Sequence, residues 1–175
     1  DRYLIATSDL LPQLLHEHQA GFVNRAVEAT YRARTHLHND RGELTAEHRA
    51  QLDEQARNIT RYLLFAEEVP LPTDGIEGDA AFKADFLKAR RAVEGESLKD
   101  FDLSARLFKH RCSYMIYSAA FAGLPPVVKQ RVYQRLAAAL SEAPPDAEYA
   151  YLLVAEKRAI RRILRGTLAD LPPGW

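Results

Sequence analysis

Apolar side chains recur every three or four residues along the first forty positions of the chain. The members of this row are Leu11, Leu15, His18, Phe22, Ala26, Ala29 and Ala33. Because an α-helix turns once every 3.6 residues, such a row lies on one face of a helix and needs another element to bury it. The pattern predicts a long helix over residues 10–37 and a partner that packs against it.

A second helix is expected directly after a short turn. Residues 39–42 read Asn-Asp-Arg-Gly, which is typical of a turn, and Thr45 is a good N-cap residue. Pro70 and Pro72 are expected to end this helix. Its apolar row is Leu52, Ala56, Ile59, Leu63 and Ala66. Two long helices joined in this way predict an antiparallel hairpin.

Prolines and glycines divide the middle of the chain into shorter segments. Residues 73–79 have the composition of an ordered turn, a short helix is expected through residues 82–87, and a break falls at Gly95. Ser97 and Asp100 resemble a capping box for a helical turn that brings residues 103–108 together. The apolar run over residues 112–122 predicts a core helix.

Two more helices are expected near the end of the chain. Pro125-Pro126 favours a helix start, with Val128, Val132, Leu136 and Leu140 as its buried row, and Pro144-Pro145 ends it. Asp146 is the predicted cap of the last helix. The buried row of that helix is Leu153, Ile160, Ile163, Leu164 and Leu168. No segment alternates long enough to predict a strand, so we expect an all-α fold: one domain over residues 1–175, a compact bundle of about six helices.

Composition excludes several classes of protein. The 24 basic and 24 acidic residues cancel, so no overall field attracts nucleic acid or an anionic membrane. Cys112 is the only cysteine, which excludes an internal disulfide and a zinc site with several thiolates. No apolar run reaches the roughly 20 residues of a membrane span. We expect a soluble protein, with the bacterial cytoplasm and periplasm both open. The start at Asp1 is consistent with a removed signal peptide or with a piece of a longer protein.

Three stretches of the chain resemble a pattern of an uncharacterised bacterial protein family. They are YLLFAEE at residues 62–68, a stretch over residues 97–118 that contains RLFKxxCSYMIYS, and the end of the chain over residues 163–175 with its terminal LPxxW. Where the family pattern has a Tyr-Pro pair, this chain has His110-Arg111. The resemblance implies the C-terminal region of a longer protein, and it implies no activity and no catalytic residue.

Histidines are the first candidates for chemistry, because neutral imidazole is a common metal ligand. Five of the six lie on or beside the predicted hairpin: His16, His18, His36, His38 and His48. A chelate on one helix needs ligands three or four residues apart, whereas the close pairs here are two apart and point to different faces. A metal site would therefore join both helices, with His18, His36, His38 and His48 as candidate ligands. The alternative is histidines that are solvated or lie at the edge of the core.

Haem is the second candidate, because His110 and Met115 are known types of axial ligand. The motif Cys-x-x-Cys-His is absent, so only non-covalent haem is open. Tyr114 and Tyr117 lie beside these residues, and an apolar core that satisfies the tyrosine hydroxyls explains the cluster as well.

Other candidate sites are weaker. The chain has no Gly-rich phosphate loop, no His-Glu-x-x-His and no nucleophile elbow, and Cys112 stands in an apolar context. The carboxylates of residues 74–79 are of the type that binds a hard cation, but they lack the spacing of an EF-hand and are only a weak indication of such a site. The basic row Lys157, Arg161 and Arg165 is suited to phosphate or an acidic surface, and also to an ordinary solvated face.

The residues favour a non-catalytic helical module that binds a protein partner or another copy, as part of a larger bacterial protein. Nucleic acid is not an expected partner, and no enzyme activity is expected. The competing hypothesis is a helical protein that binds a transition metal through the four histidines, or haem through His110 and Met115.

Overall fold

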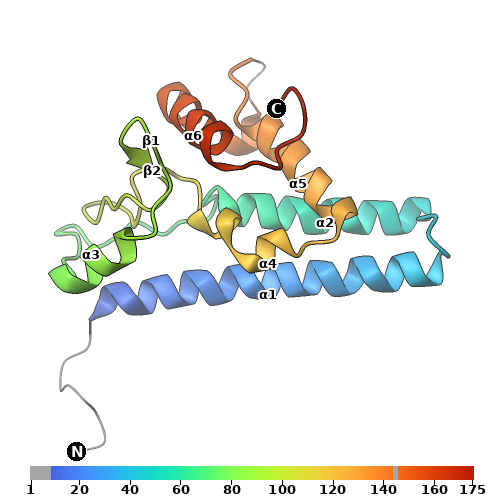
Figure 1. Cartoon of the computed structure of the whole chain (residues 1–175), viewed down its shortest axis with the longest axis horizontal. Helices are drawn as coiled ribbons and strands as arrows, with labels where there is room; N and C mark the ends of the chain where they lie inside the picture. Colours follow the sequence, from blue (N-terminus) through green and yellow to red (C-terminus); the bar gives the residue numbers. More distant parts are fainter. Residues whose placement is uncertain (1–8, 144–145) are drawn as a thin grey trace, which may run out of the picture.

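The first two helices form the long antiparallel hairpin that the sequence predicts (Figure 1). In this computed structural model, which describes residues 9–143 and 146–175, α1 covers Leu10–Asn39 and α2 covers Ala46–Leu63. Asp9 and Thr45 cap the two helices, each through a side-chain oxygen that accepts a backbone N–H of the first turn. Every member of the predicted row on α1 is buried, which confirms the face that sets this helix against the core.

Helix α2 ends before the prolines that were expected to stop it. Phe65 already has a left-handed backbone, with φ of 54°. The last carbonyls of the helix are bound by groups from far along the chain: the Ser113 N–H donates to the Leu63 carbonyl, and the Tyr151 hydroxyl donates to the Leu64 carbonyl. Apolar spacing carries no information on such tertiary contacts, so the predicted extension of the helix to the prolines is wrong.

The chain between α2 and α5 is largely irregular. The predicted short helix is confirmed as α3, Ala80–Leu87, which is capped by Asp79. The break at Gly95 is a hairpin turn between two strands, β1 (Ala92–Val93) and β2 (Glu96–Ser97), which pair antiparallel. The expectation that no strand forms is therefore wrong for this small ladder.

The capping box at Ser97 forms without a helix after it. The Ser97 N–H and hydroxyl both donate to the Asp100 carboxylate, as the spacing predicts. The chain then folds back through a bridge between Phe101 and Phe108, and Leu103 inside this loop has φ of 61°. A right-handed helix cannot contain that conformation, so the helical turn predicted after the box is wrong.

The predicted core helix over residues 112–122 is two short pieces. A 3-10 turn, η1, covers Tyr114–Tyr117, and α4 covers Ala119–Ala122. Ser113 and Ser118 have extended backbones, and each side chain accepts the N–H of a residue in the turn that follows. Each serine thus begins a new turn instead of continuing one. The predicted burial of this segment is confirmed for Cys112, Tyr114, Met115, Ile116 and Phe121.

The last two helices are present with shifted boundaries. Helix α5 covers Pro126–Ala139 and buries its predicted row, while the proline pair at residues 144–145 lies outside the described residues. Asp146 caps a short 3-10 turn, η2 (Ala147–Tyr149), and not the last helix. Helix α6 covers Val154–Thr167, and its N-cap Leu153 is 69% exposed, so the predicted burial of Leu153 is wrong.

The shorter elements lie on the hairpin (Figure 1). Helix α5 packs along α2, α4 contacts α1, and α6 contacts β1, so the core lies between the hairpin and these elements. The described residues form six α-helices and one two-stranded ladder, which confirms the predicted helical class. Within this part of the chain no helix combines the length and the apolar character that crossing a membrane requires.

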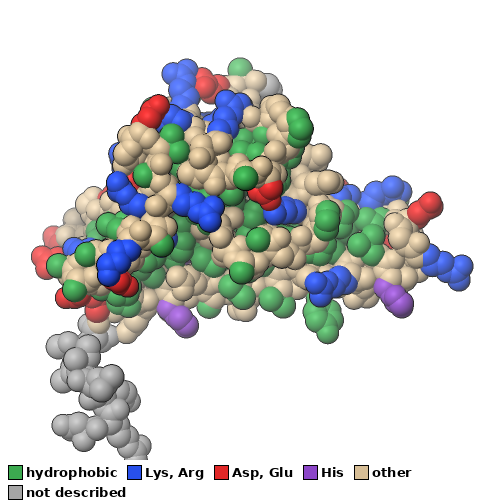
Figure 2. Space-filling view, in the orientation of Figure 1, with side chains coloured by type: hydrophobic (Ala, Val, Ile, Leu, Met, Phe, Trp, Pro, Cys, Tyr) green, Lys and Arg blue, Asp and Glu red, His purple; other side chains and the backbone are tan. Residues whose placement is uncertain are grey.

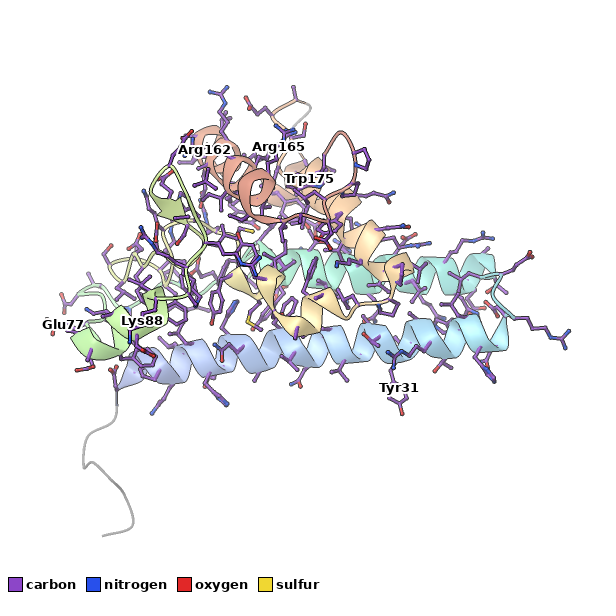
Figure 3. All side chains as sticks on the ribbon, in the orientation of Figure 1. Tyr31, Glu77, Lys88, Arg162, Arg165 and Trp175 are labelled. Carbon is purple, nitrogen blue, oxygen red and sulfur yellow. The ribbon has the colours of Figure 1, made fainter. Side chains whose placement is uncertain are left out.

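One face of α1 is not covered by any of these elements. Val23, Val27 and Tyr31 are exposed at intervals of four residues, and Figure 3 shows Tyr31 pointing away from the rest of the molecule. Figure 2 shows apolar side chains along the edge of the molecule that α1 forms. The buried row of α1 accounts for one side of the helix only.

Candidate functional site

A cleft of about 870 Å³ lies between the two helices of the hairpin. Its α1 wall includes residues from Leu14 to Glu28, and its α2 wall includes residues from Gln55 to Tyr62. Residues 65–71 and Leu107 line it as well. None of the lining residues belongs to α4, α5 or α6, so the cleft is a feature of the hairpin and of the loop that follows α2.

Four flat side chains are stacked along the wall of the cleft. The ring of His18 lies between Phe65 and Tyr62, with centroid distances of 4.9 and 5.2 Å and interplanar angles of 11° and 8°. The guanidinium of Arg25 lies 4.1 Å from the centroid of Tyr62. Nearly parallel rings with a cation at one end are a stable arrangement of aromatic and cationic groups. The wall is therefore held in one shape before any ligand arrives.

Gly21 is the residue that lets Tyr62 enter this stack. A Cβ atom on Gly21 would lie 2.3 Å from the Tyr62 hydroxyl oxygen, which is closer than real contacts allow. Tyr62 therefore lies directly over the α1 backbone, and its hydroxyl donates a hydrogen bond of 3.0 Å to the His18 carbonyl. A glycine inside a long helix usually costs stability, and here it makes room for a ring from the neighbouring helix.

The two ring nitrogens of His18, Nε2 and Nδ1, have different surroundings. Its Nε2 lies 2.6 Å from the hydroxyl of Ser113, which is fully buried and also accepts the N–H of Met115. Because the Ser113 hydroxyl oxygen already accepts the Met115 N–H, we assign its hydrogen to Nε2 and the ring proton to Nδ1. Among the described residues Nδ1 has no hydrogen-bond partner and is not fully enclosed, and His18 lines the cleft.

His18 is uncharged at neutral pH. Burial, the larger cause, and the nearby positive charge of Arg25 together lower its pKa from 6.5 to about 4. The side chain is 8% exposed, so little water is present to stabilise an imidazolium ion. The cleft therefore contains a neutral N–H donor in an aromatic wall.

The backbone at Phe65 is strained where it meets this wall. A left-handed φ of 54° is unusual for a bulky residue and costs roughly 1–3 kcal/mol. The bonds to the carbonyls of Leu63 and Leu64 hold the end of α2 in this position. The strain places the Phe65 ring against His18, and such outliers are found often at functional sites.

The charged groups of the cleft are partly neutralised within the protein. Arg61 forms ion pairs with Glu67 and Glu148, which raise its pKa, and Glu28 pairs with Arg32. Burial raises the pKa of Glu68, which forms no ion pair with the described residues. The carboxylates that line the cleft are Glu17, Glu28, Glu67 and Glu68, against the guanidiniums of Arg25 and Arg61.

The four histidines proposed as metal ligands do not converge on one point. His36 and His48 are stacked with centroids 3.9 Å apart and an interplanar angle of 15°, so their nitrogens lie in parallel planes and cannot share an ion between the rings. His48 bonds to Asp40 at 2.6 Å, and His38 is exposed. His18 lies about 27 Å along α1 from His36, at 1.5 Å per residue. The described residues contain no group of three or more metal-ligating side chains.

His110 and Met115, the proposed haem ligands, are both buried, but neither lines the cleft between the helices. The Nε2 of His110 lies 3.7 Å from Glu96, and burial lowers the pKa of its imidazole. Tyr117 donates to or accepts from Thr167, and Tyr114 accepts a bond from Gln19. Protein groups thus satisfy the tyrosine hydroxyls.

The remaining candidate residues, Cys112 and the basic row on α6, mainly make structural contacts within the protein. Cys112 is fully buried, and burial raises the pKa of its thiol, which makes it a poor nucleophile. The basic row on α6 is largely paired: Lys157 is buried against the Ser141 carbonyl, and Arg165 donates to the Trp175 carbonyl. Arg162 pairs with carboxylates of the β1–β2 hairpin. This row is therefore mainly a set of structural contacts.

The sequence indicated His18 but missed the residues around it. Tyr62, Arg25 and Phe65 carry no motif, and their stacking depends on how α2 crosses α1. The sequence contains a signal that was not used: Gly21, a lone glycine within a helical pattern. It lies one turn after His18, where the Tyr62 ring packs against the α1 backbone.

No family model, curated protein or solved structure matches this chain. The resemblance to an uncharacterised bacterial family therefore stays a prediction, and the geometry of the cleft carries the functional argument.

Proposed function

We propose that this domain is a non-catalytic binding module that holds a peptide segment of a partner protein in the α1–α2 cleft. The observation that carries the proposal is the His18 ring in a preformed aromatic wall, with Nε2 bound to Ser113 and Nδ1 assigned as an N–H donor without a partner among the described residues. A neutral donor beside apolar rings suits a neutral acceptor, and the peptide carbonyl is the commonest such group in proteins.

The length of the cleft also supports a peptide. Its α1 wall from Leu14 to Glu28 spans about 21 Å at 1.5 Å per residue. An extended chain advances about 3.3 Å per residue, so about six residues fit along this wall. Exposed side chains such as Asn24, Asn58 and Glu67 form its rim, so a chain can enter from the side.

A binding role, and not catalysis, agrees with the chemistry of the wall. The two nucleophile types near His18, the Ser113 hydroxyl and the Cys112 thiol, belong to fully buried residues. The hydrogen bond from Ser113 fixes the orientation of the imidazole. We propose further that the partner segment belongs to a protein that acts with the larger bacterial protein implied by the family resemblance.

Selection of peptides tests this proposal directly. A displayed library of random 12-residue peptides would be selected against the wild-type domain, and the affinity of the selected peptides would then be measured for two variants. Asn58→Trp places a large ring on the rim of the cleft, and Gln134→Trp makes the same change on an exposed position of α5. We expect Asn58→Trp to weaken binding at least about ten-fold, because the added ring occupies the cleft, and Gln134→Trp to leave it unchanged.

Amide chemical shifts locate the bound peptide independently. Binding in the cleft shifts the amide signals of Gly21, Arg25 and Tyr62. Selected peptides that shift only the signals of α5 and α6, or a library that yields no binder, would contradict the proposal.

A further inference from the structure

We infer that the cleft selects a peptide segment in which a lysine or arginine follows an apolar residue, with the basic side chain bound at Glu17 and the apolar one beside Leu14. This inference rests on the proposed function, because it names the chemistry of the segment that the same cleft would hold. It depends on three features: the charge of the lining, the neighbouring positions of Leu14 and Glu17 on α1, and the buried His18 beside them.

The lining of the cleft favours a cation. Four carboxylates line it against two guanidiniums, and of the four only Glu17 and Glu68 form no ion pair with the described residues. Arg61 is held between two carboxylates, and Arg25 lies on the Tyr62 ring while it donates to the Gly21 carbonyl at 2.9 Å. Glu17 forms no ion pair with the residues that the structure describes, so its carboxylate is available to a ligand.

An apolar and an acidic lining residue are neighbours on α1. Leu14 lies on α1 three residues before Glu17, while Phe65, Leu71 and Leu107 come from the loops beyond α2. Residues three apart on a helix lie on the same side, about one turn from each other. An apolar side chain seated beside Leu14 therefore places a neighbouring basic side chain within reach of Glu17.

The donor on His18 offers the peptide backbone a contact beside these two. His18 is next to Glu17 in the chain, and its open Nδ1–H suits a peptide carbonyl. His18 is 8% exposed, so water has little access to its side chain and a hydrogen bond to it is a specific anchor. An apolar residue, a carbonyl and a basic residue thus match three neighbouring features of the wall.

Other ligands fit this lining less well. An acidic peptide or a fatty acid would bring negative charge to a cleft with an excess of carboxylates, and like charges at short range weaken binding. A simple amine would satisfy Glu17 but would leave the His18 donor and most of the wall of about 21 Å unused. These ligands are outcomes of the test below.

Positional libraries of acetylated, amidated hexapeptides test the inference against the wild-type domain by fluorescence anisotropy. Each pool fixes leucine at one position and lysine, arginine, norleucine or glutamate at the next. We expect the lysine and arginine pools to bind at least about ten-fold more tightly than the norleucine and glutamate pools, with a difference that decreases as salt is added.

Charge variants locate the contact. Glu17→Lys should remove the preference for basic pools, and Glu17→Gln should reduce it if the reversed charge affects folding. The matched control is Glu43→Lys, the same change at an exposed position in the turn between α1 and α2, which should keep the preference.

The outcomes separate this inference from the proposed function. Equal binding of all pools in the cleft leaves the peptide-binding proposal standing and overturns the charge preference. A preference that survives Glu17→Lys overturns the assigned contact. Tighter binding of the glutamate pool, of butylamine or of laurate than of the basic pools overturns the inference, and the absence of binding by every pool contradicts the proposed function as well.

Discussion

Gly21 and Tyr62 show how one missing side chain shapes a site. Most positions of α1 are set by whether they face the core, but Gly21 is set by the ring that lies over its backbone. Because Tyr62 is inserted there, it separates His18 from Arg25 and forms the middle of the stack. The arrangement gives the cleft a rigid wall at the point where Tyr62 of α2 packs against the α1 backbone.

Gly21→Ala is expected to destabilise the protein, although alanine is the better helix former by about 1 kcal/mol. The new methyl group must displace Tyr62, and overpacking of this kind costs about 1–3 kcal/mol. Urea unfolding of the purified variant measures the change. In a Tyr62→Ala background the same substitution should stabilise the protein, and an equal cost in both backgrounds would show that the two residues do not interact.

His18 makes stability depend on pH. Its pKa is about 4 in the folded protein and 6.5 in the unfolded chain, so between these values the unfolded chain binds a proton that the folded protein does not. The free energy of unfolding therefore falls as the pH falls from about 6.5 to about 4. A shift of this size corresponds to roughly 3 kcal/mol.

Urea unfolding of the wild type and of His18→Gln between pH 7 and pH 4 tests this dependence. The variant keeps His110, whose pKa burial also lowers, so both proteins retain that contribution. Only the wild type should show the additional loss below pH 6.5. Parallel stability profiles would exclude a lowered pKa at His18.

At the scale of elements, apolar periodicity predicted the parts of the fold that are stabilised by one buried face. Helices α1 and α5 bury the rows that the sequence indicated, and α2 does so except for Ala66, which lies beyond the end of the helix and is partly buried. A row of apolar residues at helical spacing leaves water only when that face of the helix packs against the core. Thr45 and the prolines before α5 also act as predicted, since capping and proline preferences are local.

The segment between α2 and α5 could not be predicted in the same way. The Ser97 capping box, the serines that divide residues 112–122 and the end of α2 all depend on contacts with distant residues. The stack at the cleft has the same origin, since His18, Tyr62 and Phe65 meet through tertiary packing. The sequence indicated the Ser97 capping box and His18, but it did not indicate the distant residues that they contact.

The turn between β1 and β2 offers a test at this scale. Glu94 and Gly95 both have positive φ, at 52° and 83°, which is the geometry of a two-residue type I′ turn. Asparagine tolerates this conformation better than glutamate, so Glu94→Asn should stabilise the protein by about 0.5 kcal/mol. Thermal unfolding measures the effect, and Glu94→Ala is the control that should destabilise the turn. A lower melting temperature for Glu94→Asn would show that the contact of Glu94 with Arg162 outweighs the turn.

At the scale of the whole molecule, a nearly buried ion pair joins the irregular segment to the last helix, in addition to the pairs of Arg162. Arg111 donates to Glu156 of α6 through its backbone N–H and its guanidinium, with a shortest distance of 2.6 Å. Burial alone would raise the pKa of Glu156, but these hydrogen bonds outweigh burial and the pKa is lowered. The pair is nearly enclosed, with 9% of the Glu156 side chain exposed.

Glu156→Gln should destabilise the domain by about 3 kcal/mol, because the Arg111 charge loses its partner in a place where water has little access. The matched substitution is Glu142→Gln, which removes the exposed partner of Arg158 and should change stability little. Both variants can be compared by guanidinium unfolding at pH 7. Equal effects of the two substitutions would contradict the assigned role of burial.

The bond between His18 and Ser113 also has a consequence for the order of folding. The two residues are 95 positions apart, whereas the hairpin itself is made by contacts between neighbouring helices. Contacts between residues far apart in the sequence form late in folding, because closing the long loop between them costs conformational entropy. A nascent chain that has reached only α2 can pair its first two helices, yet it lacks the hydroxyl that orients the His18 ring. The wall of the cleft is therefore completed only after residue 113 has joined the hairpin.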